Sequence, residues 1–191
     1  MIGFDVDQTK VDTINAKKSF IKHIASSEIA EAIEADRFRA TSEFSEIGKV
    51  EAVIICVPTP VGAHREPDIS YVLKSGEAIA PHLKNGCLVV LESTTYPGTT
   101  EGPLKHTIVK ASGFTAGEDF HLAYSPERED PGRTDHSVAP IPKVVGGYTA
   151  KCRDKAGALY GKALANPHPV DSCAVAEACK LTEHIFRRVN I

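Results

Sequence analysis

The chain has 191 residues, of which 42% are hydrophobic and 25% charged, and its formal net charge is −3. This length fits one domain, or one domain and part of a second, and allows a sizeable core without disulfide or metal support. The lack of a basic excess argues against a dedicated nucleic-acid-binding protein, and no apolar run approaches the ~20 residues that cross a bilayer. The N-terminus, MIGFDVDQTK, lacks the basic start and apolar core of a signal peptide, so we expect a cytoplasmic protein.

The chain's five cysteines and eight histidines show no metal-site spacing. The cysteines are odd in number without a CxxC pair, and the histidines form no HxxxH pair or zinc-type cluster. We therefore expect reduced thiols and no metal site. Cys56 and Cys87 lie in or beside apolar runs, which predicts that both are buried like small hydrophobic residues.

Short apolar runs alternate along the chain with longer stretches of helical spacing. The runs predict strands over residues 1–4, 52–57, 88–91, 121–124 and 143–145. The other stretches predict helices over residues 8–17, 27–36, 70–83, 100–111, 150–164 and 175–190. Residues 146–147 and 165–171 are expected to be turns, and the run AVIICV at 52–57 predicts a strand covered on both faces. This alternation predicts an α/β fold with a mainly parallel sheet.

Proline, glycine and polar residues gather where the predicted strands end. Asp5 ends the first strand, Pro58-Thr59-Pro60 follows the second, and residues 92–98 and 125–132 follow the third and fourth. Each segment alone reads as an ordinary turn, because these residue types dominate any loop. Ligands in open parallel sheets bind outside the carboxyl ends of the strands, so several such loops at one edge favour a binding crevice.

Two smaller patterns leave alternatives open. Asp5 is placed to bind the adenosine ribose hydroxyls of NAD at the end of a strand, or else to help cap the next helix. Glu177, Lys180 and His184 share one helix face, where they could hold an anionic intermediate. A solvated face with one ion pair is the favoured interpretation of that spacing.

Six segments together resemble the UDP-glucose/GDP-mannose dehydrogenase family, and the nearest branch resembles the bacterial UDP-N-acetylglucosamine 6-dehydrogenases. They are GFDVD at 3–7, VPTP at 57–60, ESTTYPGTTE at 92–101, YSPEREDPG at 124–132, IPKVVGG at 141–147 and AEACKLTEHIFRRVNI at 176–191. The resemblance implies a Rossmann-like domain over residues 1–171 without its first βα unit, and the start of a connecting, dimerising helix over residues 172–191. It also implies NAD-dependent oxidation of the C6 alcohol of a UDP-sugar to a uronic acid for polysaccharide synthesis.

Site residues follow from the same resemblance. Asp5 and Lys10 would hold the adenosine ribose of NAD, Val57, Pro58 and Thr59 would line the dinucleotide, and Ser93 and Thr94 would lie near the nicotinamide. Thr94 would position water, Glu127 would act as an acid/base or water-orienting group, and Lys180 would stabilise an oxyanion. His184 stands where the family usually has asparagine; its imidazole can also donate a hydrogen bond, but it is bulkier than the amide and titrates.

The resemblance places the glycine-rich turn, the catalytic cysteine and the nucleotide-sugar domain outside these 191 residues. We therefore expect the chain alone to be inactive, and none of its five cysteines to be the nucleophile. A non-catalytic dinucleotide-binding or assembly module, dimerising through Leu181, Ile185 and Val189, remains an alternative. Another NAD-dependent hydroxyacid-type dehydrogenase is a third, which the ESTTYPG and YSPERE segments disfavour.

Overall fold

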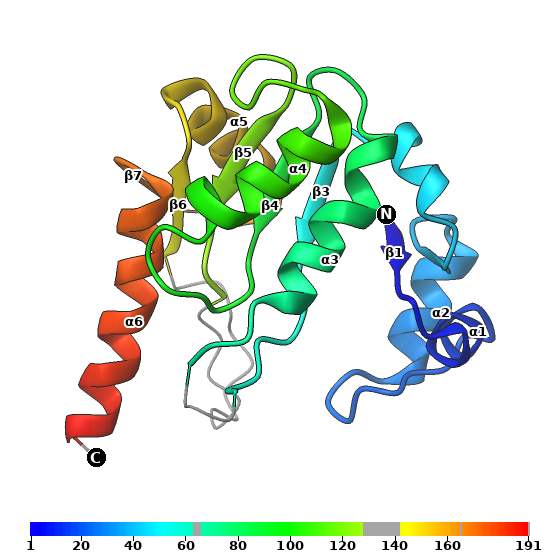
Figure 1. The fold of residues 1–191 in the computed structure, drawn as a ribbon. Helices are drawn as coiled ribbons and strands as arrows, with labels where there is room; N and C mark the ends of the chain where they lie inside the picture. Colours follow the sequence, from blue (N-terminus) through cyan, green and yellow to red (C-terminus); the bar gives the residue numbers. More distant parts are fainter. Residues whose placement is uncertain (63–65, 128–141, 165, 191) are drawn as a thin grey trace. The chain divides into compact units, whose positions relative to one another are not determined.

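The computed structural model describes residues 1–62, 66–127, 142–164 and 166–190, without the side chains of residues 184, 187, 188 and 190. The chain divides into two compact units, Met1–Glu46 and Ile47–Ile191, which are described separately. A 3-10 helix, η1 (Phe44–Lys49), spans the boundary between them. Figure 1 shows the order of the elements in each unit.

The first unit is a short parallel strand pair with two helices. Strand β1 (Ile2–Phe4) pairs with β2 (Arg39–Thr41), and helices α1 (Gln8–Asn15) and α2 (Ser26–Glu34) lie between them in the chain. Asp7 caps α1, because its carboxylate accepts a hydrogen bond from the Thr9 amide at 2.9 Å. Strand β2 was not predicted from the sequence, since it is three residues long and contains no apolar run.

The second unit is built on a five-stranded sheet. Its strands, in spatial order, are β3 (Ala52–Ile55), β4 (Leu88–Leu91), β5 (His121–Tyr124), β6 (Lys143–Gly147) and β7 (Pro167–Val170). All neighbouring pairs are parallel except β5 and β6, which are antiparallel. The predicted α/β class with a mainly parallel sheet is confirmed.

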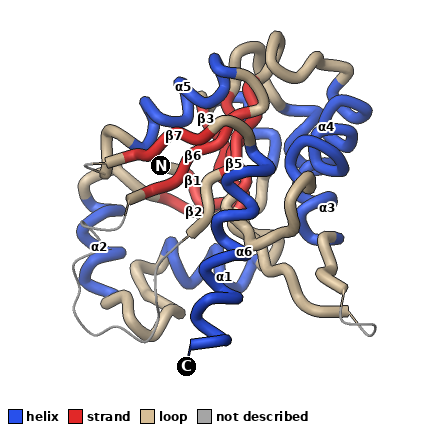
Figure 2. Tube along the Cα trace, turned by 90° about the vertical axis from the view of Figure 1, so that its left-hand side faces the viewer, coloured by secondary structure: helices blue, strands red, loops and turns tan. Residues whose placement is uncertain are grey.

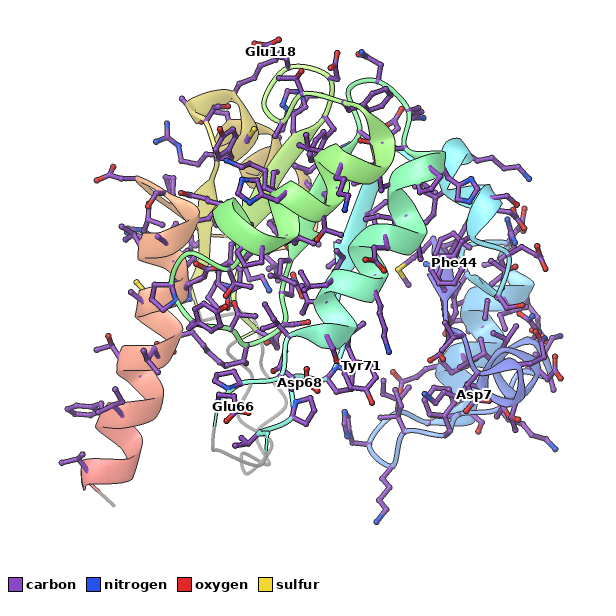
Figure 3. The ribbon with its side chains drawn as sticks, in the orientation of Figure 1. Asp7, Phe44, Glu66, Asp68, Tyr71 and Glu118 are labelled. Carbon is purple, nitrogen blue, oxygen red and sulfur yellow. The ribbon has the colours of Figure 1, made fainter. Side chains whose placement is uncertain are left out.

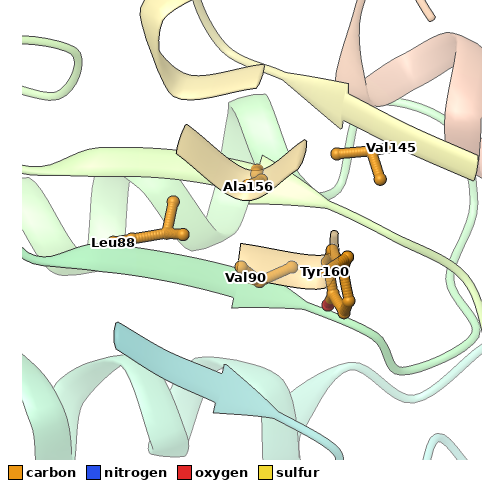
Figure 4. Packing of buried hydrophobic residues seen from close by; sticks show 6 residues of the cluster. Leu88, Val90, Val145, Ala156 and Tyr160 are labelled. Atoms are coloured by element: carbon orange, nitrogen blue, oxygen red, sulfur yellow. The ribbon is translucent and has the colours of Figure 1, made fainter. Parts of the chain in front are cut away.

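Helices cover both faces of this sheet. Helix α5 (Ala150–Tyr160) packs on β4, β5, β6 and β7, while α3 (Ser70–Ile79) and α4 (Lys105–Ser112) lie on the other side, as Figure 2 shows. A short 3-10 helix, η2 (Ala80–His82), follows α3, and a π-helix, η3 (Thr100–Leu104), precedes α4. Helix α6 (Cys173–Asn190) packs on β5, β6 and η3 and ends the chain. Figure 4 shows the core beneath α5, which contains Leu88, Val90, Val145, Ala156 and Tyr160.

Two predicted turns are wrong. Residues 146–147 complete strand β6, and residues 167–170 form strand β7. Gly146 has no room for a side chain, because the backbone just before α6 approaches it: a Cβ there would lie 2.2 Å from the Ser172 carbonyl oxygen. The prolines of β7 are tolerated because this strand lies at the edge of the sheet.

The prediction that AVIICV is a strand covered on both faces is also wrong. The strand ends at Ile55, and Ile54 is 45% exposed because β3 is an edge strand of the five-stranded sheet. Cys56 therefore begins the following loop and is exposed, against the prediction of burial, whereas Cys87 is buried as predicted.

Candidate functional site

The polar loops of the second unit follow β3, β4 and β5 at the carboxyl edge of the sheet. The chain after β3 leads through Glu66 and Asp68 to Tyr71 in the first turn of α3, and these residues lie at that edge in Figure 3. Glu118, in the loop that precedes β5, lies at the opposite end of the unit (Figure 3). The predicted loop over 125–132 is described only as far as residue 127.

Hydrogen bonds join the loop after β3 to the loop after β4. The Ser93 hydroxyl accepts from the Val57 amide at 2.9 Å and donates to the Val57 carbonyl oxygen at 2.8 Å. The Thr59 hydroxyl donates to the Thr94 carbonyl oxygen at 2.7 Å. Ser93 is buried, so its hydroxyl holds the two loops together rather than facing a ligand. The structure thus brings Val57, Thr59, Ser93 and Thr94 to one place.

Thr94 differs from the residues on both sides of it. Ser93 and Thr95 are buried with their hydroxyls hydrogen-bonded inside the protein, whereas Thr94 is exposed. The Tyr124 hydroxyl donates to the Ser93 carbonyl oxygen at 3.3 Å, which holds the chain immediately before Thr94. Thr94 is therefore an exposed residue on a backbone that its neighbours hold in place.

A carboxylate that the sequence did not single out, Glu92, is the centre of a polar cluster beneath these loops. Lys143 Nζ lies 2.9 Å from Glu92 Oε1, the Tyr160 hydroxyl donates to the same oxygen, and Cys56 Sγ lies 3.6 Å from Oε2. Partial burial of the Cys56 sulfur, followed by the nearby Glu92 charge, raises the pKa of this thiol to about 12. Burial and Glu92 likewise raise the pKa of Tyr160. The Lys143 ammonium offsets the desolvation cost of this buried carboxylate.

Glu127 extends from this cluster toward solvent. Its side chain is 57% exposed, and its Oε2 lies 3.5 Å from Lys143 Nζ. Its main-chain carbonyl oxygen accepts a hydrogen bond from the Lys180 ammonium of α6. The structure therefore joins two predicted site residues, Glu127 and Lys180, through the backbone of one and the side chain of the other.

The prediction of a solvated face for Glu177 and Lys180 is wrong, because both residues are buried. The Glu177 carboxylate accepts hydrogen bonds from the Gly98 amide at 2.6 Å, the Thr100 amide at 3.0 Å and the Thr100 hydroxyl at 2.7 Å. Burial raises the pKa of the Glu177 carboxyl, against these hydrogen bonds, which favour its charged form. The third residue of this predicted face, His184, has its side chain outside the described part of the structure.

In the first unit, Asp5 and Lys10 form an exposed ion pair. Lys10 Nζ lies 3.2 Å from Asp5 Oδ2, and the Asp7 amide donates to Asp5 Oδ1 at 2.9 Å. Asp7, not Asp5, caps the helix. Each Asp5 oxygen accepts one of these bonds and can accept more. The carboxylate therefore suits a ligand with two adjacent hydroxyl donors, such as a ribose.

Other site types have little support among the described residues. No group of three or more His, Cys, Asp or Glu side chains there could hold a metal ion. No described helix is long and apolar enough to cross a membrane. Pro58 is exposed and supplies shape rather than a polar group.

The chain resembles known nucleotide-sugar dehydrogenases. Residues 1–164 match the model of the UDP-glucose/GDP-mannose dehydrogenase family, NAD binding domain. All of the chain matches 45% of a UDP-N-acetyl-D-glucosamine 6-dehydrogenase from Pseudomonas aeruginosa, with 35% identity over 192 residues. It also matches 46% of a UDP-N-acetyl-D-mannosamine dehydrogenase from Salmonella typhi, with 39% identity over 198 residues.

Solved structures give the same result. The chain superimposes over its whole length on 45% of the UDP-D-ManNAc dehydrogenase from Pyrococcus horikoshii, with a TM-score of 0.92 and 29% identity. The chain thus spans about half the length of the relatives that it matches.

Proposed function

Because the chain belongs to the UDP-glucose/GDP-mannose dehydrogenase family, we propose that it forms the dinucleotide-binding part of an NAD-dependent UDP-sugar dehydrogenase. Such an enzyme oxidises the C6 alcohol of the sugar to a carboxylate for polysaccharide synthesis. The match of residues 1–164 to the NAD-binding domain of this family carries the proposal. UDP-N-acetylglucosamine is the proposed substrate, supported by a 35% identical relative of that specificity. Unpaired cysteines among the described residues support a cytoplasmic location.

The proposed NAD contacts are six residues of the loops that follow the strands and of α1. Asp5 and Lys10 bind the adenosine ribose, and the unoccupied lone pairs of the exposed Asp5 carboxylate support this role. Val57, Pro58 and Thr59 line the dinucleotide. Ser93 acts through its bonds to Val57, which set the shape of the loop. NAD supplies the hydride acceptor, while the residues of this chain orient it and exclude water.

Four residues are proposed for the chemistry itself. Thr94 positions water, which its exposure on a fixed backbone supports. Glu127 takes or gives a proton near the reacting carbon, since it is exposed beside the Lys143 charge. Lys180 stabilises the developing oxyanion, and its buried position beside the Glu127 carbonyl fixes its ammonium. His184 is proposed to donate a hydrogen bond to the same intermediate.

The 191-residue chain by itself is proposed to be inactive. We propose residues 1–171 as the partial NAD-binding domain and residues 172–191 as the start of the connecting helix. Capture of the aldehyde needs a thiolate, but Cys87, Cys152 and Cys173 are buried and the Cys56 thiol has a pKa of about 12. The fifth cysteine, Cys179, is half-buried, and the family resemblance does not place it at the position of the nucleophile. An assay for NADH with UDP-N-acetylglucosamine and NAD is therefore expected to show no turnover; measurable turnover would contradict this proposal.

A homodimer is proposed through α6. Leu181, Ile185 and Val189 recur every four residues on this helix and are 45%, 55% and 76% exposed. A stripe of this kind is typical of a helix that packs against another helix. Sedimentation should show a dimer that dissociates in the Ile185→Lys variant. A monomer in the parent chain would exclude this assembly.

The cofactor assignment is tested by calorimetry with NAD and NADP. The parent chain is expected to bind NAD more tightly, because the Asp5 carboxylate repels the 2′-phosphate of NADP. Asp5→Asn should weaken NAD binding and reduce that preference. Asp12→Asn is the control, since Asp12 lies on α1 and its carboxylate accepts a hydrogen bond from the Gln8 side-chain amide at 2.8 Å. Equal effects of the two substitutions would exclude the role of Asp5.

A further inference from the structure

The backbone around Thr94 is held from several sides, and one of the holding groups comes from α6. The Ser93 and Thr94 carbonyl oxygens accept hydrogen bonds from Tyr124 and Thr59 respectively. The next hydroxyl, that of Thr95, donates to Glu177 at 3.4 Å across 82 residues of sequence. The exposed Thr94 thus lies between two fixed neighbours.

Glu177 holds the remainder of this loop as well. Gly98 has φ +95°, a conformation that glycine adopts readily, and its amide donates to Glu177 Oε2 at 2.6 Å. The amide and hydroxyl of Thr100, in the first turn of η3, donate to Oε1. Every one of these partners is a donor, and a carboxylate near a helix N-terminus is favoured by the helix dipole. An ionised carboxylate can accept all of these bonds at once.

The contact between α6 and η3 is reciprocal. Glu101, beside Thr100 in η3, accepts a hydrogen bond from the Cys173 amide at the start of α6 at 2.9 Å. Each of the two helical segments therefore provides a carboxylate to the other. The Glu101 bond joins the two segments without contacting the 93–98 loop, whereas the Glu177 bonds hold that loop itself.

We propose that Glu177 is a positioning residue of the dinucleotide site: by fixing residues 95–100 against α6, it keeps Thr94 in the geometry that its ligand requires. This inference rests on the proposed function. A movement of α6 reaches Thr94 through Glu177, while Lys180, one turn further along α6, contacts the loop of Glu127. Helix α6 thereby sets the positions of both polar loops, those that follow β4 and β5.

The test compares Glu177→Gln with Glu101→Ala in the 191-residue chain. The glutamine side chain has nearly the same size but presents an NH₂ group to a donor, so at least one bond to the loop is lost. Glu101→Ala removes the other carboxylate and is expected to lower the unfolding midpoint without reaching the loop. Methyl relaxation of Thr94 and the Kd for NAD are measured in both variants. Neither measurement should change when only the stability of the contact between α6 and η3 is reduced.

Glu177→Gln is expected to increase the mobility of the Thr94 methyl group and to weaken NAD binding about tenfold, the equivalent of one strong hydrogen bond. Glu101→Ala should leave the Thr94 methyl mobility and the Kd for NAD within about twofold of the parent chain. A twofold change in Kd corresponds to less free energy than one such hydrogen bond. Unchanged Thr94 mobility in Glu177→Gln, or equal changes in both variants, overturns the proposal. If Glu177→Gln does not fold, Glu177→Asp is used, whose shorter carboxylate cannot reach every donor. If the parent chain binds no NAD, the proposed function fails for this chain, and Thr94 mobility still decides the role of Glu177.

Discussion

The buried ion pair between Glu92 and Lys143 provides the sharpest stability prediction. The side chains of Lys143 and Glu92 are only 9% and 13% exposed, and their charged atoms lie 2.9 Å apart. Lys143→Met keeps the apolar stem but leaves the Glu92 carboxylate buried without a counter-charge, which typically costs 3–5 kcal/mol. We expect about 3 kcal/mol, the lower end of that range, because the Tyr160 hydroxyl still donates to Glu92.

The double variant Glu92→Gln/Lys143→Met separates charge from packing. Replacing both charges by neutral groups of similar size is often close to neutral, so this variant should lie within about 1 kcal/mol of the parent chain. Asp154→Asn is the control for an exposed ion pair. The Asp154 side chain is 71% exposed and pairs with Arg153, so its replacement should change the free energy of unfolding by less than about 0.5 kcal/mol.

Urea unfolding followed by tyrosine fluorescence measures these differences in the second unit alone. All five tyrosines of the chain lie there, and the sequence contains no tryptophan. A loss below about 1 kcal/mol in Lys143→Met would contradict this prediction, because a buried, unpaired carboxylate must cost more. A double variant as unstable as Lys143→Met would also refute it.

Three further predictions concern glycines, a histidine and a thiol. Gly146→Ala should cost several kcal/mol, about the cost of overpacking or more, because its Cβ would lie 2.2 Å from the Ser172 carbonyl oxygen. Gly157→Ala, in α5 with open space around it, should stabilise by about 0.5–1 kcal/mol; urea unfolding measures both. Burial lowers the pKa of His121, so its contribution to stability is present above its unfolded value of about 6.5 and is lost as the pH falls below it. The free-energy difference between the parent and His121→Gln, followed from pH 8 to pH 5, should therefore shift against the parent, and a constant difference would contradict this. Cys56, although exposed, should react with iodoacetamide at pH 8 at least about a hundredfold more slowly than in urea, because its thiol pKa is about 12; mass spectrometry gives the rates, and similar rates would exclude the raised pKa.

The elements that the sequence predicted correctly carry local signals. The apolar runs at 88–91 and 121–124 are strands over those same residues, and Gly113 ends α4 in a left-handed conformation, as its place after the helix predicts. Strands β2 and β7 carry no such signal. Their backbone hydrogen bonds come from neighbours distant in sequence, which no local pattern records.

The sequence likewise predicted only those parts of the candidate site that a local motif marks. Motifs located the loops that contain Thr59, Ser93 and Thr94, and the structure joins them by hydrogen bonds. The burial of Glu177 was missed, because its partner Thr100 lies 77 residues away and helical spacing resembles that of a surface ion pair. The Glu92 cluster was missed because Lys143 and Tyr160 approach it from separate elements.

The most direct test of the account is a titration of NAD into the isotope-labelled chain, followed by the amide resonances of Asp5, Thr59 and Thr94. We predict that all three resonances shift as NAD is added, because each residue is a proposed NAD contact. Unchanged resonances of Thr59 and Thr94 at millimolar NAD would contradict the proposed dinucleotide site, and an unchanged Asp5 resonance would contradict the proposed ribose contact.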